Sequence, residues 1–224
     1  MNSGHPLRRT MGRRVLKKID PQLDLSRHLQ SIDMLPRPWD TAALFGREAP
    51  LEVEVGCGKG LFLQSAAAAV PDHNFLGIEL AHKYARYSAA RLAQRNLANA
   101  IVVQGDAQRV FRELMVDDSL LAVHVYFPDP WWKKRHFKRR VMNPEFLNDV
   151  ARVLAPGARL HFWTDVKEYY DATLTLLAAQ VLLIGPFNVS ERPAGHDLDY
   201  RTHFERRMRL SDLPVYRAEF CKSG

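Results

Sequence analysis

Short apolar runs alternate with segments of helical spacing through the middle of the chain. The apolar runs are rich in Val, Ile, Leu and Phe and are bounded by polar or turn residues, which is typical of buried strands. They occupy residues 51–55, 74–78, 101–104, 120–127 and 159–164. Each is followed by a segment with apolar residues at helical spacing, and these segments are 60–69, 82–96, 108–114, 144–153 and 167–180. Strands and helices that alternate in this way predict right-handed crossovers and a parallel sheet covered by helices on both faces.

The two ends of the chain lack this alternation. Residues 20–50 contain four prolines and are expected to form an ordered but irregular lead-in. After Gly185 we expect no further helix, and three strands that extend one edge of the sheet are predicted at 187–190, 202–210 and 215–221. The predicted fold class is therefore α/β, a doubly wound and mostly parallel Rossmann-like sheet of about seven strands.

The composition agrees with a globular protein, because 46% of the 224 residues are hydrophobic and 25% are charged. This length predicts one domain, which we place at residues 19–224 behind a basic arm at residues 1–18. Six basic side chains and no acidic one make this arm a candidate for contact with RNA, and an inert solvated tail is the alternative. The net charge of +7 favours an anionic partner such as nucleic acid, and an anionic membrane surface stays open.

Several classes of protein are disfavoured. Basic residues interrupt the first 18 positions, so no signal peptide is expected, and the longest apolar stretch, 172–184, is too short to cross a bilayer. The two cysteines, Cys57 and Cys221, form no CxxC pair or Cys/His cluster, which disfavours a zinc site and a disulfide framework. We therefore expect a cytoplasmic protein.

A glycine-rich turn follows the first predicted strand, where an open parallel sheet binds its ligand. Gly56, Gly58 and Gly60 permit close backbone approach and positive φ. Their GxGxG spacing puts Leu61 where the dinucleotide fingerprint GxGxxG needs its third glycine, so an NAD site is disfavoured. A tight loop without a ligand is the alternative interpretation.

Acidic residues accompany the ends of three consecutive predicted strands. Glu79 lies about 20 residues after the turn, where a carboxylate accepts hydrogen bonds from ribose hydroxyls. Asp106 is placed to hold an adenine amino group, or to cap the helix that follows it. Glu54, just before the turn, faces the positive end of a ligand. The three acids suit a nucleoside that carries an amino acid and a cationic sulfur, and residues 50–180 resemble the class I S-adenosylmethionine-dependent methyltransferases in this respect.

The most informative segment, residues 126–140, reads YFPDPWWKKRHFKRR. Two prolines stiffen the backbone around Asp129, so its carboxylate projects from a nearly fixed frame. Trp131 and Trp132 are suited to stacking on a base. The basic side chains that follow are suited to holding phosphates, and they are Lys133, Lys134, Arg135, Lys138, Arg139 and Arg140. The alternative is a solvated basic helix start beside core tryptophans.

This segment is similar to the FPDPWxKxRHxKRR motif of the bacterial tRNA (guanine-N7-)-methyltransferase family. Residues 201–207, RTHFERR, resemble that family's TxFE segment, and Thr164-Asp165 follows the fifth strand as it does in that family. The resemblance implies a site for S-adenosylmethionine at Glu54, Gly56, Gly58, Gly60, Glu79, Asp106 and Asp129. It also implies a substrate site at Lys133, Asp165, Thr202, His203, Phe204 and Glu205. The chain departs from the family at Cys57, where an aromatic residue is usual, and at Trp132, where His is more common.

The implied reaction is methyl transfer to N7 of guanine in tRNA, at guanosine 46 of the variable loop. Guanine N7 has an in-plane lone pair and no proton, so we expect no general base and no metal. Asp129 is the expected catalytic residue, since its carboxylate would accept hydrogen bonds from the guanine or the cofactor and offset the charge that methylation leaves on the base. Three alternatives stay open: an exocyclic amino methyltransferase, an RNA-binding protein without activity, and an NAD-dependent dehydrogenase.

Overall fold

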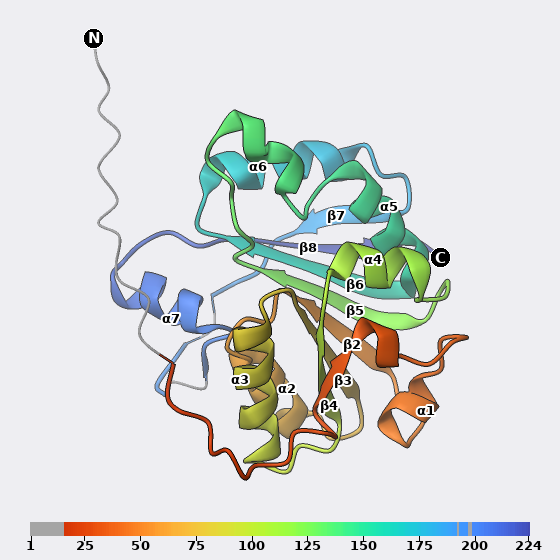
Figure 1. Ribbon diagram of the computed structural model, residues 1–224. Helices are drawn as coiled ribbons and strands as arrows, with labels where there is room; N and C mark the ends of the chain where they lie inside the picture. Colours follow the sequence, from red (N-terminus) through yellow and green to blue (C-terminus); the bar gives the residue numbers. More distant parts are fainter. Residues whose placement is uncertain (1–15, 192, 197–198) are drawn as a thin grey trace.

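The computed structural model describes residues 16–191, 193–196 and 199–224, and within them one eight-stranded sheet forms the centre of the molecule (Figure 1). The strand order is β1-β4-β3-β2-β5-β6-β8-β7. Strands β1 to β6 pair in parallel, and β8 runs antiparallel to both β6 and β7. The strands are β1 (Leu29–Ser31), β2 (Leu51–Val55), β3 (Asn74–Glu79), β4 (Ala100–Gln104), β5 (Leu120–Tyr126), β6 (Leu154–Thr164), β7 (Leu183–Phe187) and β8 (Tyr216–Lys222).

Helices cover both faces of this sheet, as the alternating pattern predicts. In Figure 1, α2 and α3 lie on one face, and α4, α5 and α6 lie on the other. The α-helices are α1 (Thr41–Phe45), α2 (Leu61–Ala69), α3 (His82–Ala93), α4 (Ala107–Glu113), α5 (Pro144–Val153), α6 (Lys167–Ala178) and α7 (His203–Leu210), and the two 3-10 helices are η1 (Ile32–Met34) and η2 (Lys134–Arg139). The fold class and the five central strands with their helices are confirmed.

Alternate side chains of the central strands supply the two halves of the core. Val53, Leu76 and Val123 belong to the larger cluster, which also holds Phe111 of α4 and Phe146 of α5. The neighbouring strand residues, such as Phe75 and Val102, point to the opposite face of the sheet. They belong to the second cluster, with residues of α2 and α3. A strand that is apolar on both sides needs cover on both faces, which explains the continuous apolar runs in the sequence.

The prediction of a strand at 202–210 is wrong, because His203–Leu210 is helix α7. The Thr202 hydroxyl accepts a hydrogen bond from the Glu205 backbone N–H at 3.0 Å, which caps the helix. Glu205 and Met208, three residues apart, are buried together on one helix face. The T-x-x-E spacing is a capping signal, and it outweighs the strand interpretation of this short segment.

The other differences lie at the edges of the sheet. The lead-in contributes an edge strand, β1, beside β4, so the sheet has eight strands although 202–210 is helical. The strand predicted at 187–190 lies earlier, as β7, whereas the prediction at 215–221 is confirmed by β8. Most of the predicted arm, residues 1–15, is outside the described residues. No helix in the described part of the chain combines the length and the apolar character that crossing a membrane requires.

Candidate functional site

The glycine-rich turn joins β2 to α2 with all three glycines in the left-handed region. Gly56, Gly58 and Gly60 have φ values of 75°, 53° and 67°. The Gly56 N–H donates to the Ile78 carbonyl at 2.8 Å, which ties the turn to β3. A Cβ at position 60 would lie 2.0 Å from the hydroxyl of Ser88 on α3. The turn therefore requires glycine, both for its conformation and for the close approach of α2 to α3.

The Glu79 carboxylate is held in place by the turn. One of its oxygens accepts a hydrogen bond from the Gly58 N–H at 2.9 Å, and the other accepts from the Ala81 N–H at 2.8 Å. A carboxylate oxygen accepts more than one hydrogen bond, so both oxygens retain acceptor capacity. The geometry suits a ligand that carries two neighbouring hydroxyls, as the sequence predicts for this position.

Glu54 lies next to Glu79 in a very different environment. Its residue is 3% exposed, and its Oε2 has no hydrogen-bond partner among the described residues. Burial, and next the charge of Glu79, raise the pKa of Glu54 well above its ordinary value. A buried acceptor without a partner is uncommon in folded proteins. This oxygen therefore fits a ligand that brings a hydrogen-bond donor or a positive charge.

Asp106 lies at the end of β4 and is the N-cap of α4. Its Oδ1 accepts a hydrogen bond from the Gln108 N–H at 2.9 Å, which confirms the capping interpretation. The residue is exposed, so its second oxygen is accessible to a ligand. A contact between Asp106 and a base stays a prediction.

The Asp129 segment continues directly from β5 at the same edge of the sheet. The Phe127 N–H donates to the Trp163 carbonyl at 2.7 Å, which anchors the start of the segment to the end of β6. Phe127 and Trp131, on either side of Asp129, have φ values of 51° and 48°, a conformation that bulky residues rarely adopt. Asp129 itself is exposed. The carboxylate therefore stands on a constrained turn that faces solvent.

The basic residues after Asp129 divide into two groups. Five are exposed around η2 and keep their charges available to a partner, and they are Lys133, Lys134, Arg135, Lys138 and Arg139. The exposed indole of Trp132 and the Trp131 ring, which lies 5.0 Å from the Arg139 guanidinium, stand beside them. Arg140 is different, because it is 7% exposed and donates from Nε to the Pro130 carbonyl at 2.8 Å. Its guanidinium is thus enclosed, and the contact with RNA that the sequence implies for Arg140 stays a prediction.

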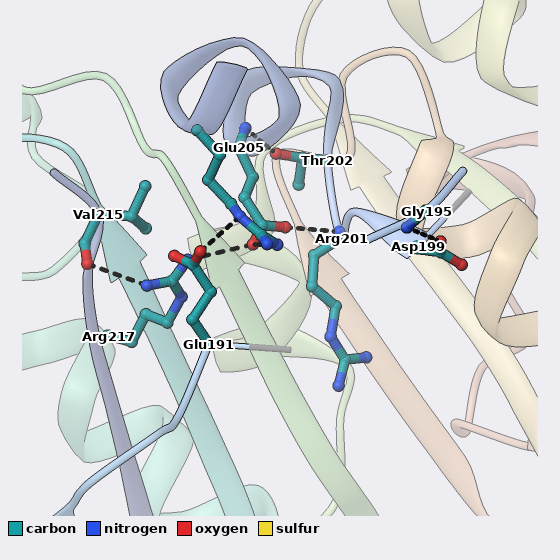
Figure 2. Close-up of polar contacts among 9 residues, drawn as sticks. Glu191, Gly195, Asp199, Arg201, Thr202, Glu205, Val215 and Arg217 are labelled. Carbon is teal, nitrogen blue, oxygen red and sulfur yellow. Dashed lines mark hydrogen bonds and ion pairs between the residues drawn. The ribbon is translucent and has the colours of Figure 1, made fainter. Parts of the chain in front are cut away.

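The TxFE segment forms the start of α7 and has its own ion-pair network (Figure 2). Glu205, 3% exposed, accepts from the Arg201 N–H at 2.6 Å and lies 3.2 Å from the Arg217 guanidinium. Glu191 bridges Arg217 and Arg209 at 2.9 Å each. In Figure 2 the Arg201 guanidinium points away from this network. Thr202 and Glu205 therefore shape the local backbone, and their contact with substrate stays a prediction.

Helix α7 brings the TxFE segment into contact with both other parts of the site. The Phe204 ring lies 5.0 Å from the Phe127 ring, beside the Asp129 segment. His203 Nε2 lies 2.7 Å from a guanidinium nitrogen of Arg91, which also lies 3.4 Å from the Lys59 carbonyl of the glycine-rich turn. Asp165, partly buried, follows β6 at the same edge.

Sequence reasoning missed Arg91 and Ser88, which hold the turn from α3. The Arg91 Nε donates to Gln64 of α2 at 2.8 Å, and Ser88 lies beneath Gly60. The partners are more than 20 residues away in the sequence, so no local motif marks them. Within the described residues no three His, Cys, Asp or Glu side chains are gathered as a metal site would require.

Known proteins resemble this chain over most of its length. A family model described as a putative methyltransferase matches residues 48–218. A tRNA (guanine-N(7)-)-methyltransferase of Rhodopirellula baltica is 48% identical over 218 residues, which cover 95% of this chain and 80% of that protein. The protein of the same name from Bordetella parapertussis is 42% identical over 178 residues, which cover 79% of this chain and 69% of that protein.

The fold also matches solved methyltransferases. The 16S rRNA methyltransferase KamB aligns with a TM-score of 0.57 and 18% identity, over 82% of this chain and 94% of that chain. At this identity the likeness concerns the fold alone. The family model and the sequence relatives show that the chain belongs to the tRNA (guanine-N7-)-methyltransferase family.

Proposed function

We propose that this protein transfers a methyl group from S-adenosylmethionine to N7 of guanine in tRNA, with guanosine 46 of the variable loop as the target. One observation carries the proposal. The contact between Phe204 and Phe127 joins the TxFE helix to the exposed Asp129 segment, at the sheet edge where Glu54 and Glu79 lie. The family membership supports the substrate and the atom that is modified.

Glu54, Glu79 and Asp106 lie around the glycine-rich turn and form what we call the glycine-turn site. These acids fit S-adenosylmethionine. Glu54 would hold the ammonium of the methionine moiety, which supplies the partner that its buried Oε2 lacks. Glu79 would accept from the ribose hydroxyls while its two backbone hydrogen bonds keep it oriented. Asp106, at the end of the next strand, would accept from the adenine amino group with the oxygen that does not cap α4. The cofactor, when bound, supplies a methyl group made electrophilic by its sulfonium.

The protein's main task in this reaction would be to hold guanine N7 in line with the methyl group that it accepts. N7 needs no deprotonation, so Asp129 would act as a hydrogen-bond acceptor and a negative charge near a base that becomes positive. Its position on a constrained turn favours this role, because orientation of two reactants lowers a barrier by roughly 7–11 kcal/mol. The substrate residues predicted at Lys133, Asp165 and 202–205 surround this turn or lie at the same edge of the sheet.

The five exposed cations around η2 would hold tRNA phosphates. They follow two tryptophans in the chain, of which Trp132 has 57% of its surface exposed. Stacking of a base on an aromatic ring together with phosphate contacts is a common mode of RNA binding. We therefore place the RNA on the face that Trp132 and η2 form.

The test is incubation of the full chain with bulk tRNA and labelled S-adenosylmethionine, followed by nucleoside analysis. We expect 7-methylguanosine as the labelled product, and a transcript in which guanosine 46 is replaced by adenosine should take up no label. N6-methyladenosine as the sole product would mean that the enzyme is an exocyclic amino methyltransferase. Label in the substituted transcript would contradict the assignment of position 46 alone.

A further inference from the structure

The Arg140 guanidinium lies near the Asp129 segment and packs against two aromatic rings. Its Cζ lies 3.6 Å from the centre of the Phe137 ring and 4.6 Å from the centre of the Tyr169 ring. Its side chain is 8% exposed, and its ion pair with exposed Glu168 is long, at 3.9 Å. The planar group therefore packs against two aromatic rings, while its edge donates to polar partners.

The Arg140 Nε, on that edge, forms a hydrogen bond with a residue ten positions earlier in the chain. It donates to the Pro130 carbonyl at 2.8 Å, one residue after Asp129. A charged donor makes a stronger hydrogen bond than a neutral one, and partial burial strengthens it further. The bond therefore closes the segment between residues 130 and 140 into a loop with a fixed base.

The other end of this link is fixed to the core. Tyr169 of α6 is 1% exposed, and its hydroxyl accepts from the Met142 N–H at 3.2 Å. The Arg140 carbonyl accepts from the Asn143 side chain at 3.0 Å, and Asn143 also caps α5. Arg140 thus connects the Asp129 turn to α5 and α6, whose buried residues belong to the core of the fold.

We propose that Arg140 is a positioning residue, which sets the place of the Asp129 carboxylate by holding the Pro130 carbonyl, and that it makes no phosphate contact. The proposal rests on the proposed function, in which Asp129 meets the target guanine. The turn needs such support because Phe127 and Trp131 both adopt left-handed backbone conformations, which persist only where the surroundings enforce them. A displacement of about 1 Å in such a group costs on the order of 100-fold in rate.

The first experiment separates positioning from phosphate binding by kinetics. R140A, R140K and the neighbouring exposed R139A are compared with the wild type for kcat, for KM for tRNA and for the salt dependence of tRNA affinity. We expect R140A to lose about 10- to 100-fold in kcat, with an unchanged salt slope. R139A should flatten the log–log slope by about 0.7 to 0.9, the value of one phosphate contact.

The lysine variant gives the sharper distinction. Lysine keeps the charge but lacks the planar group that packs against Phe137 and Tyr169, so R140K should keep the kcat defect of R140A. A flatter salt slope in R140A that R140K restores, with kcat unchanged, would overturn the proposal and make Arg140 a phosphate ligand.

The second experiment does not depend on methyl transfer. Amide hydrogen exchange across residues 127–134 is measured in the same variants, and the thermal midpoint reports whether each variant folds. We expect about tenfold faster exchange in folded R140A and R140K, and wild-type exchange in R139A. Wild-type exchange in R140A would overturn the role of Arg140 even in an active enzyme. Absence of 7-methylguanosine from the wild-type reaction would instead contradict the proposed function and leave the exchange result valid.

Discussion

Glu54 and Glu79, two neighbouring carboxylates of the glycine-turn site, differ in their hydrogen-bond partners. Glu79 accepts two backbone hydrogen bonds, from Gly58 and Ala81, whereas Glu54 is buried with one oxygen unpartnered in the described structure. Burial first, and then the charge of Glu79, raise the pKa of Glu54 well above the ordinary value of 4.5. Burial therefore favours the neutral form of Glu54 more than that of an exposed glutamate, and a cation in the site would favour its charged form.

This difference predicts that cofactor binding releases a proton. An ammonium beside Glu54 stabilises the carboxylate and lowers its pKa, so binding is coupled to ionisation and affinity should rise with pH until Glu54 ionises without the ligand. Calorimetry at about pH 6 in buffers of different ionisation enthalpy measures the release. E54Q should bind more weakly and release no proton from this position. Binding to the wild type without any proton release would contradict this role.

The exposed position of Asp129 predicts a selective loss of turnover. Asp129→Ala removes a side chain that is exposed at a strand end, so the fold should survive while guanine loses its acceptor. We expect a fall in kcat of about 100-fold or more, comparable to the loss of one transition-state hydrogen-bond partner, and a thermal midpoint close to that of the wild type. Wild-type turnover in the folded variant, with cofactor affinity unchanged, would show that the role is misassigned.

At the scale of elements, α7 is the piece that completes the site. Its first turn combines a capped N-terminus with the buried carboxylate of Glu205, which is shared between the Arg201 backbone and the Arg217 guanidinium (Figure 2). Phe204, in the same turn, reaches the Asp129 segment. The stability of this turn therefore bears on the substrate side of the site.

Thr202→Ala should destabilise the protein through the loss of this cap. Removal of a Ser or Thr N-cap costs about 1 kcal/mol, and urea unfolding monitored by circular dichroism measures the change. T175A is the matched control, because Thr175 lies exposed within α6 and its hydroxyl bonds the Asp171 carbonyl four residues earlier. Alanine favours a helix interior, so T175A should not destabilise. Equal stability of T202A and the wild type would mean that the cap contributes nothing to α7.

At the scale of the whole molecule, the cations of η2 are not the only exposed basic group, because a second one lies beside the amino-terminal segment. Lys17 and Lys18 line a surface cavity together with Lys83 and Arg86 of α3. The exposed cations of η2 follow β5, and α3 follows β3, so both groups belong to connections at the carboxyl ends of parallel strands. We propose that the basic arm, residues 1–18, contributes further phosphate contacts from this side.

Deletion of residues 1–18 should therefore weaken tRNA binding in a salt-dependent way. Two or three lost phosphate contacts would flatten the log–log salt slope by about 2 units, with the largest loss of affinity at low salt. The affinity for S-adenosylmethionine should not change, since the arm contributes none of the acids assigned to that site. Measurement of tRNA affinity across a salt series compares the two chains. Equal slopes would mean that the arm is an inert tail.

The fold could be predicted largely from the sequence because its central strands carry a local signal. Apolar runs such as 74–78 and 101–104 are buried on both faces of the sheet, and only a sheet covered by helices on both sides satisfies such runs. The placement of Glu79 and Asp106 at one edge follows from the same argument, since the carboxyl ends of parallel strands meet there.

Only the tertiary structure decided those features that depend on contacts between residues distant in the chain. Residues 202–210 are helical because Thr202 caps the turn and because a buried face finds Arg217 and Phe127 to contact. Arg140 belongs by sequence to a run of cations, yet it is enclosed by Phe137 and by Tyr169, which lies 29 residues further along the chain. A pattern of hydrophobic and polar positions determines which face of an element is buried, whereas the energy of a buried charge depends on the particular groups that surround it. Only the folded chain brings those groups together.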